Sequence, residues 1–416
     1  MNVNTESDKL ILCLSGGGFR ASIFHLGVLR RLHEMGVLEM VSTISSVSGG
    51  SILAGHLADR MVQHGLKSLS EITDWDRQIG DPFLEFVARD LRTWPILWTL
   101  PFNWLFPVPR AAHLVKRYRD RLSKLQLKDI PSSPRFVFCA TDLAFGVSWY
   151  FEKETIGDYQ AGYVETPEDM SLAFAVAASA CFPPIFGPMG VPISHEKFKG
   201  GKYKGSDYKK VMSGLRLSDG GVYDNLGIEP ALKRHRTAIV SDCGAPFTFK
   251  VSKIPFIKYS RYITVVQKQV SSLRKTQLFS LISDGAQDLE MGSSGDLQGG
   301  RVNLRRGVYL GLTSDAEGYG APQRDGWSGY SEELVKRTFG SIRTDLDGFT
   351  AGERAVLVNH GYSLADVGLR KYLSGLGDDL ASFETPHPEW CDEERVAQAL
   401  KYSSWRLWPP RWFDRS

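Results

Sequence analysis

The chain opens on LILCLSGGGFRA, residues 10–21, and this stretch decides the fold. Residues 10–14 form an unbroken apolar run that ends at three glycines, as expected of a buried parallel strand followed by a tight loop. Beyond the loop, apolar residues recur at the spacing of one helix face from Val28 to Met35. The β-branched residues 41–45 then predict a second strand. Strand, glycine loop, helix and strand make a βαβ opening, which is typical of an α/β fold.

The composition is that of a packed globular protein. The chain has 416 residues, of which 42% are hydrophobic and 23% charged, which excludes a disordered chain, a collagen-like fibre and a coiled coil. The 50 Lys and Arg residues nearly balance 47 Asp and Glu, leaving a net charge of +3. A dedicated nucleic-acid binder carries a clear basic excess, so that class is excluded too.

The cysteines and the N-terminus indicate a reducing compartment. The five cysteines are far apart, and no pair has the CxxC spacing of a zinc or redox site, so we expect reduced, mostly buried thiols. The first 14 residues carry Glu6 and Asp8 and a short apolar run, unlike a secretory signal. We therefore expect a cytoplasmic protein.

The glycine loop, GGGFRA at residues 16–21, formally fits the dinucleotide fingerprint G-x-G-x-x-G/A. That fingerprint also needs an acidic residue at the end of the second strand, where this chain has Ser45 and Ser46. A P-loop is excluded because no G-K-[S/T] follows. Backbone N–H groups at a helix N-terminus still make an anion site, and the anion could equally be the oxyanion of an acyl-transfer intermediate.

A second motif, SVSGG at residues 46–50, joins the second strand to a helical pattern at residues 52–62. It is G-x-S-x-G with Ser46 in place of the first glycine, so Ser48 takes the central position of a nucleophile elbow. The alternative is a serine- and glycine-rich turn with no chemistry. Because one strand precedes that of Ser48, too few for the α/β-hydrolase fold, a different hydrolase architecture is required.

A third motif, DGG at residues 219–221, is either an ordinary turn or the source of the base that a serine nucleophile needs. In this order the three motifs resemble those of the patatin-like phospholipases, and GGGFRA also resembles the glycine loop of the cytosolic phospholipase A2 group. Residues 140–142 (ATD) and 177–180 (AASA) are further similar segments. The resemblance covers roughly residues 8 to 365.

The resemblance implies a three-layer α/β fold, with a mostly parallel central sheet between helices, and a Ser–Asp dyad. Ser48 would be the nucleophile and Asp219 the base. The oxyanion hole would come from the backbone N–H groups of the loop Gly16, Gly17 and Gly18. Arg20 stands where a related arginine meets the lipid phosphate; otherwise it is a solvent-facing residue of the first helix.

The function that the resemblance implies is a lipid acyl hydrolase. It would cleave carboxylic esters of glycerophospholipids through an acyl-serine intermediate, with no cofactor and no metal. A soluble esterase or an acyltransferase with the same dyad is the alternative within enzymes. An inactive membrane-binding module is the alternative of another class.

Neither a histidine base nor a calcium site is expected from the sequence. Three histidines follow Asp219 in the chain but lie in no recognisable motif, so we expect none of them to be the base: His235, His360 and His387. Residues 345–348 (DLDG) mimic part of an EF-hand. Arg343 and Arg354 stand where that loop needs carboxylates, so we expect no calcium site there.

Two tryptophan-rich segments have two interpretations. Residues 93–109 carry three tryptophans and no charge, but four prolines exclude a spanning helix. The C-terminal tail holds three more, at positions 405, 408 and 412, beside arginines. These rings either bind a phospholipid membrane surface peripherally or pack against the hydrolase body. We expect that surface as the partner and no nucleic acid; whether an activating partner or a nucleotide signal gates the activity stays open.

The expected organisation is a hydrolase domain over residues 1–325, with an aromatic-rich insert at about 75–130, and a helical C-terminal extension over 326–416 packed on it. Further strands are expected at residues 136–140, 238–241 and 262–267, and helices at residues 171–180, 331–339 and 351–359.

Overall fold

The computed structural model of the chain describes residues 10–89, 110–183, 186–244, 255–290, 304, 306–320 and 326–403. Both tryptophan-rich segments, and with them the choice between lipid contact and core packing, lie outside the described residues. Within the described ones, no helix has the length and hydrophobicity needed to cross a bilayer.

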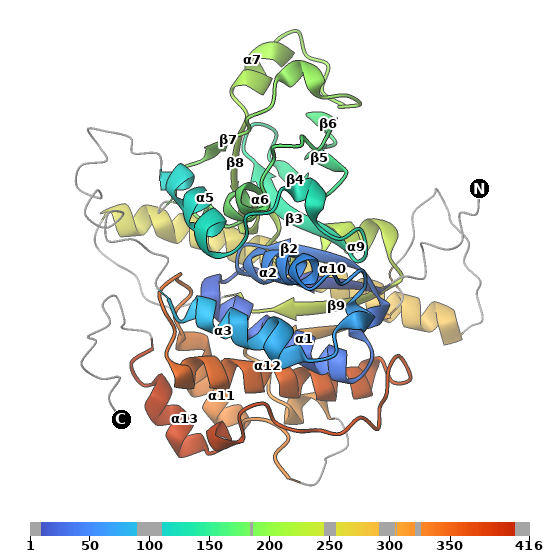
Figure 1. Cartoon of the computed structure of the whole chain (residues 1–416), viewed down its shortest axis with the longest axis vertical. Helices are drawn as coiled ribbons and strands as arrows, with labels where there is room; N and C mark the ends of the chain where they lie inside the picture. Colours follow the sequence, from blue (N-terminus) through green and yellow to red (C-terminus); the bar gives the residue numbers. More distant parts are fainter. Residues whose placement is uncertain are drawn as a thin grey trace.

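The described strands form one ten-stranded sheet with helices packed around it (Figure 1). The strands are β1 (Leu10–Leu14), β2 (Val41–Val47), β3 (Arg135–Asp142), β4 (Val147–Phe151), β5 (Thr155–Asp158), β6 (Gly162–Glu165), β7 (Met189–Gly190), β8 (Arg216–Asp219), β9 (Thr237–Asp242) and β10 (Arg306–Gly311). The α-helices are α1 (Gly18–Glu34), α2 (Gly49–Gln63), α3 (Asp81–Val87), α5 (Arg110–Arg121), α6 (Leu172–Ser179), α7 (Tyr208–Ser213), α8 (Gly221–Asp224), α9 (Glu229–Arg234), α10 (Pro255–Glu290), α11 (Glu332–Thr338), α12 (Ala351–Tyr372) and α13 (Glu393–Leu400).

The centre of the sheet is parallel. Its strand order is β10-β9-β1-β2-β3, each pair parallel, and β4 and β8 then pair with β3 antiparallel. The mostly parallel central sheet that the sequence predicts is therefore confirmed. Because β1, β2 and β9 are parallel neighbours, the loops after their carboxyl ends meet at one edge, where open α/β sheets bind ligands.

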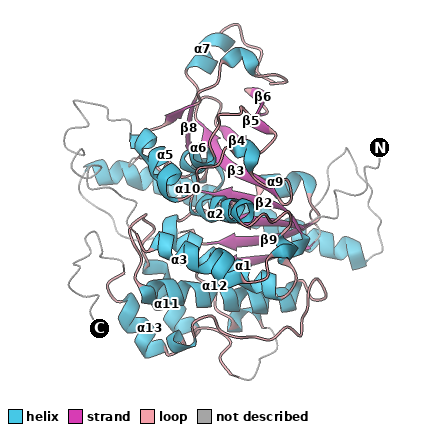
Figure 2. Cartoon of the chain, in the orientation of Figure 1, coloured by secondary structure: helices cyan, strands magenta, loops and turns pink. Residues whose placement is uncertain are grey.

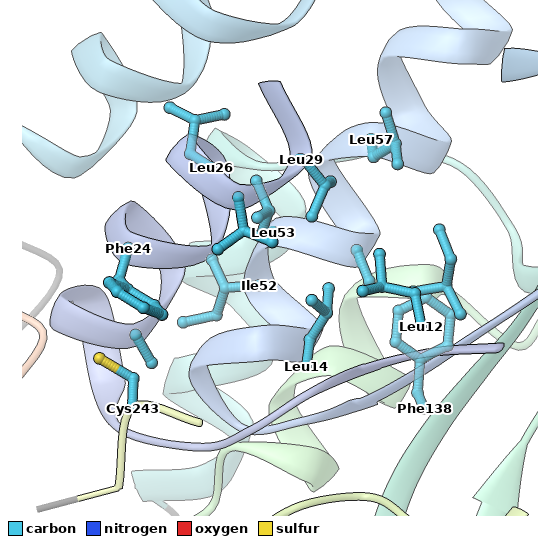
Figure 3. Packing of buried hydrophobic residues seen from close by; sticks show 14 of the residues in the cluster. Leu12, Leu14, Phe24, Leu26, Leu29, Ile52, Leu53, Leu57, Phe138 and Cys243 are labelled. Atoms are coloured by element: carbon cyan, nitrogen blue, oxygen red, sulfur yellow. The ribbon is translucent and has the colours of Figure 1, made fainter. Parts of the chain in front are cut away.

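Both faces of the sheet are covered, as the alternation along β1 shows. Leu12 and Leu14 point into the large core beneath α1 and α2 (Figure 3). Ile11 and Cys13 point to the other face, into a second core that includes Leu278 of α10. A strand that is apolar on both faces needs helices on both faces, and Figure 2 shows the strands set between layers of helix. The three-layer α/β fold is thus confirmed.

Helix α12 lies alongside α1 (Figure 1). Two glycines let their backbones touch: a Cβ on Gly27 would lie 2.0 Å from the Val358 carbonyl oxygen, and one on Gly361 would lie 2.1 Å from that of Phe24. This contact places the segment before α12 against the glycine loop at the start of α1.

One predicted strand is wrong. Residues 262–267 are β-branched and aromatic, which favours a strand, yet they belong to the 36-residue helix α10. Intrinsic strand propensity is weak without a neighbouring strand to pair with. Here Tyr262 and Val266 are exposed on the helix surface, and the helix-forming residues that follow them continue the same helix.

Candidate active site

Ser48 occupies a sharp turn between β2 and α2. Its φ and ψ are 50° and −113°, and among the described non-glycine residues it alone has a positive φ. That conformation is strained for a residue with a side chain, and such strain is concentrated at functional sites. The strand–turn–helix context is the one in which a nucleophile elbow exposes its serine hydroxyl.

The elbow and the glycine loop pack against each other through their backbones. A Cβ on Gly49 would lie 2.2 Å from the Gly18 carbonyl oxygen, so a side chain there would separate the two loops. Ser22 of α1 holds the contact, because its hydroxyl lies 2.6 Å from the Gly49 carbonyl oxygen and 3.2 Å from that of Gly18. The two glycine motifs, about 30 residues apart in the sequence, thus form one structural unit.

A buried serine at the end of α6 supports the elbow from below. Ser179 Oγ accepts the Ser48 N–H at 2.9 Å and donates to the Cys139 carbonyl at 2.6 Å. Ser51 Oγ lies 2.8 Å from Ser179 Oγ.

Ser46 stands at the first glycine position of the G-x-S-x-G pattern, and its φ is not positive. It is the penultimate residue of β2, and its hydroxyl donates to the Val137 carbonyl at 3.2 Å and accepts from Ser51 at 3.0 Å. The side chain therefore points between β2 and β3, away from the hydroxyl of Ser48. The departure from the family pattern becomes part of the elbow's support.

Asp219 ends β8, opposite Ala140 of β3. The carboxylate is buried. Its Oδ1 accepts the Gly221 N–H at 2.7 Å, and its Oδ2 has no hydrogen-bond partner among the described residues. Burial raises the pKa of Asp219 to about 6, while the Ser48 hydroxyl and the Gly221 N–H act in the opposite direction. A carboxylate with a pKa near 6 suits general base catalysis close to neutral pH.

The glycine loop offers two backbone donors. Within the described part of the chain, the N–H groups of Gly17 and Gly18 have no hydrogen-bond acceptor. The N–H of Gly16 donates instead to the Asn225 carbonyl at 3.0 Å, so Gly16 lines the site without offering a donor. Gly18 begins α1, where unpaired N–H groups and the helix dipole favour negative charge.

These groups share one cavity of about 280 Å³. Its described lining consists of Gly16, Gly17, Gly18, Ser48, Ala180, Phe182, Phe186, Asp219, Gly221, Asn225, Asp242, Gly244, Gln267, Lys268, Ser271, Thr344, Asp345 and Leu346. A larger surface groove, about 690 Å³, lies between α3 and the start of α12 and contains none of the predicted site residues. The chemistry therefore belongs to the smaller cavity.

None of the three histidines that follow Asp219 lines this cavity. His235 bonds Thr43 and His360 bonds the Leu312 carbonyl, both in buried positions. His387 lies at the surface groove beside α3. The titratable groups of the described lining are thus Asp219, Asp242, Asp345 and Lys268, and the pKa of Asp219 is the one that the Ser48 hydroxyl lowers.

Arg20 does not lie where the resemblance implies. Its side chain is buried, and its two terminal nitrogens donate to the carbonyls of Ile342 and Cys243, each at 2.7 Å. It is absent from the described lining of the cavity. The expectation of a phosphate contact is therefore corrected. Arg20 connects α1 to the segments at Ile342 and Cys243 through hydrogen bonds, and its side chain does not face the solvent either.

Several lining residues carry no motif signal. Thr344, Asp345 and Leu346 come from the C-terminal region, and a Cβ on Gly18 would lie 2.1 Å from the Thr344 carbonyl oxygen. Lys268 comes from α10, of which residues 262–267 were predicted as a strand. Among the lining residues without a predicted role, Ala180 belongs to residues 177–180, one of the segments that carry the resemblance. Within the described residues, no cluster of three potential metal ligands is present.

Comparison with known proteins places these features in context. A family model described as "Patatin-like phospholipase" matches residues 12–232. Similar solved structures include the human GIVD cytosolic phospholipase A2, with 13% identity, a TM-score of 0.44, and coverage of 96% of this chain and 63% of that one. VipD from Legionella pneumophila has 14% identity, a TM-score of 0.33, and coverage of 95% and 74%. This chain thus spans less than two thirds of the human enzyme's chain. No curated protein sequence matches it significantly.

Proposed function

Because the chain belongs to the patatin-like phospholipase family, we propose that it is a lipid acyl hydrolase that cleaves carboxylic esters of glycerophospholipids with a Ser48–Asp219 dyad. One observation carries the proposal. The strained Ser48, the buried Asp219 and the donors of Gly17 and Gly18 line a single cavity. These are the nucleophile, base and oxyanion donors that acyl transfer requires.

In the first half-reaction, Asp219 Oδ2 takes the hydroxyl proton of Ser48 as Oγ attacks the ester carbonyl carbon. The carbonyl oxygen becomes negative and is stabilised by the N–H groups of Gly17 and Gly18. Collapse of the tetrahedral intermediate breaks the bond to the glycerol oxygen, which leaves with the proton from Asp219. Ser48 then carries the acyl group.

In the second half-reaction, Asp219 takes a proton from a water molecule whose oxygen attacks the acyl carbon. Collapse of this intermediate releases the fatty acid and returns the proton to Ser48 Oγ. Each proton transfer in the two half-reactions takes place between Ser48, Asp219, the leaving glycerol oxygen and water. The proposal therefore includes no cofactor.

The lining also supports an acyl substrate. Phe182, Phe186 and Leu346 are apolar side chains in the same cavity as the dyad. Ligand sites usually combine such apolar walls with a few convergent polar groups. An acyl chain placed along these side chains would leave its ester carbon beside Ser48.

A phospholipid surface is the proposed place of action. Tyr262, Val266 and Leu273 of α10 are 70%, 61% and 67% exposed. At 100° per residue they fall within about 40° of one another, on the face opposite the cavity-lining residues of the same helix. Three exposed apolar side chains on one helix face suit the lipid interface, and binding there would bring a wall of the cavity to the bilayer.

The decisive experiment is labelling with a fluorophosphonate, which phosphonylates activated serines. We expect one adduct on Ser48, and loss of both the adduct and phospholipid hydrolysis in Ser48→Ala. Ser42→Ala, in the same strand, is the matched control and should behave as the wild type. An adduct on another serine, or hydrolysis by a folded Ser48→Ala protein, would refute the assignment.

A further inference from the structure

The wall of the cavity formed by α10 carries a positive charge. Gln267, Lys268 and Ser271 of this helix line the same cavity as Ser48 and Asp219. Among the described residues of that lining, Lys268 alone is a cation. Lys268 therefore supplies the positive charge of the cavity that contains the dyad.

Two neighbouring cations, Arg20 and Lys275, lie outside the described lining. Arg20 is buried with its terminal nitrogens on two backbone carbonyls. Lys275, two helical turns after Lys268, forms an ion pair of 2.6 Å with Asp242. Asp242 also accepts the Tyr309 hydroxyl at 2.6 Å and the Gly244 N–H at 2.8 Å. Asp242, one of three aspartates in the described lining, is thus occupied by partners other than the substrate.

The surroundings of Lys268 favour an incoming anion. Burial lowers the pKa of its ammonium group; Asp242 opposes this shift, and Lys275 and Arg20 add to it. A bound anion would offset the cost of burying the Lys268 ammonium group and its repulsion by Lys275 and Arg20. The amide of Gln267 and the hydroxyl of Ser271 supply further hydrogen-bond donors on the same wall.

A glycerophospholipid presents such an anion at the right place. Its phosphate is attached to the glycerol carbon next to the one that carries the central acyl ester. An ester carbonyl at Ser48 therefore keeps the phosphate within a few bonds, inside a cavity of about 280 Å³. A neutral acylglycerol offers the same ester with no charge.

We propose that Lys268, with Gln267 and Ser271, binds the glycerol-linked phosphate of the substrate and makes the cavity selective for phospholipids over neutral acylglycerols. This inference rests on the proposed function, because it assigns the substrate class of the same dyad. It also replaces Arg20 as the group that contacts phosphate.

The test compares two water-soluble esters, monomeric diheptanoylphosphatidylcholine and neutral dibutyrylglycerol, so that membrane binding plays no part. For Lys268→Gln we expect kcat/KM to fall about 10- to 100-fold on the phospholipid, which is the effect of losing a charged hydrogen bond. The loss should appear mainly in KM, with little change on the neutral ester. Lys268→Arg should restore most of the phospholipid activity.

Arg274→Gln is the matched control, since it removes a positive charge from a position on α10 outside the lining, and its ion-pair partner Glu229 lies outside the lining as well. Its ratio of phospholipid to neutral-ester activity should equal that of the wild type. An unchanged ratio in Lys268→Gln, or the same change in both variants, would overturn the inference. A wild-type protein that hydrolyses neither ester would refute the proposed function instead.

A binding measurement keeps the inference testable in that case. Calorimetric titration of Ser48→Ala with diheptanoylphosphatidylcholine should give saturable binding that Lys268→Gln weakens by a similar factor. Equal affinities with and without Lys268 would refute the inference. Inorganic phosphate, titrated in the same way, should bind far more weakly than the lipid. Phosphate that binds as tightly, and depends equally on Lys268, would indicate a free-phosphate site and contradict the lipid assignment.

Discussion

Ser179 Oγ accepts the backbone N–H of Ser48 at 2.9 Å, and this bond connects the end of α6 to the strained turn between β2 and α2. The two residues are 131 positions apart. A positive φ at Ser48 persists only if its surroundings hold it, and this bond is one of the restraints. The geometry of the turn thus depends on a helix that contributes no reacting group.

Ser179→Ala should therefore impair catalysis more than stability. Without the hydroxyl, the Ser48 N–H loses its acceptor and the turn can relax, so we expect kcat to fall about tenfold, equivalent to about 1.4 kcal/mol, with KM nearly unchanged. Steady-state kinetics and the rate of fluorophosphonate labelling measure this.

The matched control is Ser171→Ala at the start of the same helix, where the hydroxyl accepts the Phe174 N–H at 3.1 Å. Losing that cap should cost about 1 kcal/mol of stability while kcat stays at its wild-type value. Equal kinetic losses in the two variants would mean that Ser179 acts only through the stability of α6.

The pH dependence of kcat/KM should follow the ionisation of the Asp219 carboxyl group. A general base must be ionised, and burial raises the pKa of this carboxyl to about 6. We expect kcat/KM on a soluble ester to rise with pH and reach half its plateau near pH 6. Asp219→Asn should lose about 10²- to 10⁴-fold in activity, and single His→Gln changes at His235, His360 and His387 much less. A histidine variant as inactive as Asp219→Asn, with intact circular dichroism, would replace the dyad by a triad.

Arg20 should behave as a structural residue. Arg20→Met leaves the carbonyls of Ile342 and Cys243 without donors, and buried unsatisfied groups cost about 1–3 kcal/mol each. Denaturant unfolding should show a loss in that range, and any kinetic defect should affect neutral and phosphate-bearing esters alike. Arg30→Met, which breaks partly exposed ion pairs of the same helix, should cost at most about 1 kcal/mol. A selective loss on phospholipids alone would restore Arg20 as the phosphate contact.

A buried acid pair should make stability fall as pH rises. Asp142 and Asp158 end β3 and β5, and burial, together with the charge of Asp158, raises the pKa of Asp142 to about 7. The folded protein thus retains a proton that the unfolded chain releases near pH 4. Stability is fully present at low pH and is lost as pH approaches and passes 7.

Asp142→Asn should remove this dependence. The amide can donate to Asp158 at every pH, while its oxygen still accepts the Ala144 N–H, a bond of 2.6 Å in the wild type. We expect a flatter curve of unfolding free energy between pH 5 and pH 8 and a more stable protein at pH 8. The exposed Asp169→Asn should keep the wild-type slope, and an unchanged slope in Asp142→Asn would contradict the shared proton.

The exposed face of α10 should contribute to lipid binding. Tyr262, Val266 and Leu273 changed together to Ser should weaken co-sedimentation with phospholipid vesicles about tenfold or more, since burying one large apolar side chain is worth about 1.5–3 kcal/mol. Turnover of a soluble ester should be unaffected. Serine at three exposed apolar positions elsewhere, Tyr372, Leu380 and Tyr402, is the control. Equal vesicle binding by both triple variants and the wild type would refute this surface.

Short-range patterns were sufficient for the opening of the fold and for the turn at Ser48, whereas the role of Asp219 was implied only by the family resemblance. The apolar run Leu10–Leu14 and the glycines after it could form little other than a buried strand and a tight turn, and β1 has those bounds. Ser48 follows from its place in a strand–turn–helix motif. These features depend on hydrophobic periodicity and on backbone conformations that few residues other than glycine adopt, and both are local properties.

The walls of the site depended on tertiary contacts. Whether a cation lines the cavity depends on where its helix packs, and spacing along the chain does not encode that packing. Arg20 follows the glycine loop in sequence, yet its side chain is buried and donates to backbone carbonyls. Lys268 is about 220 residues from Ser48 in sequence, yet it lines the cavity. The helix that carries Lys268 was itself predicted in part as a strand. Its β-branched residues favour that conformation locally, and the long-range packing that gives the helix its neighbours is a property of the folded chain alone.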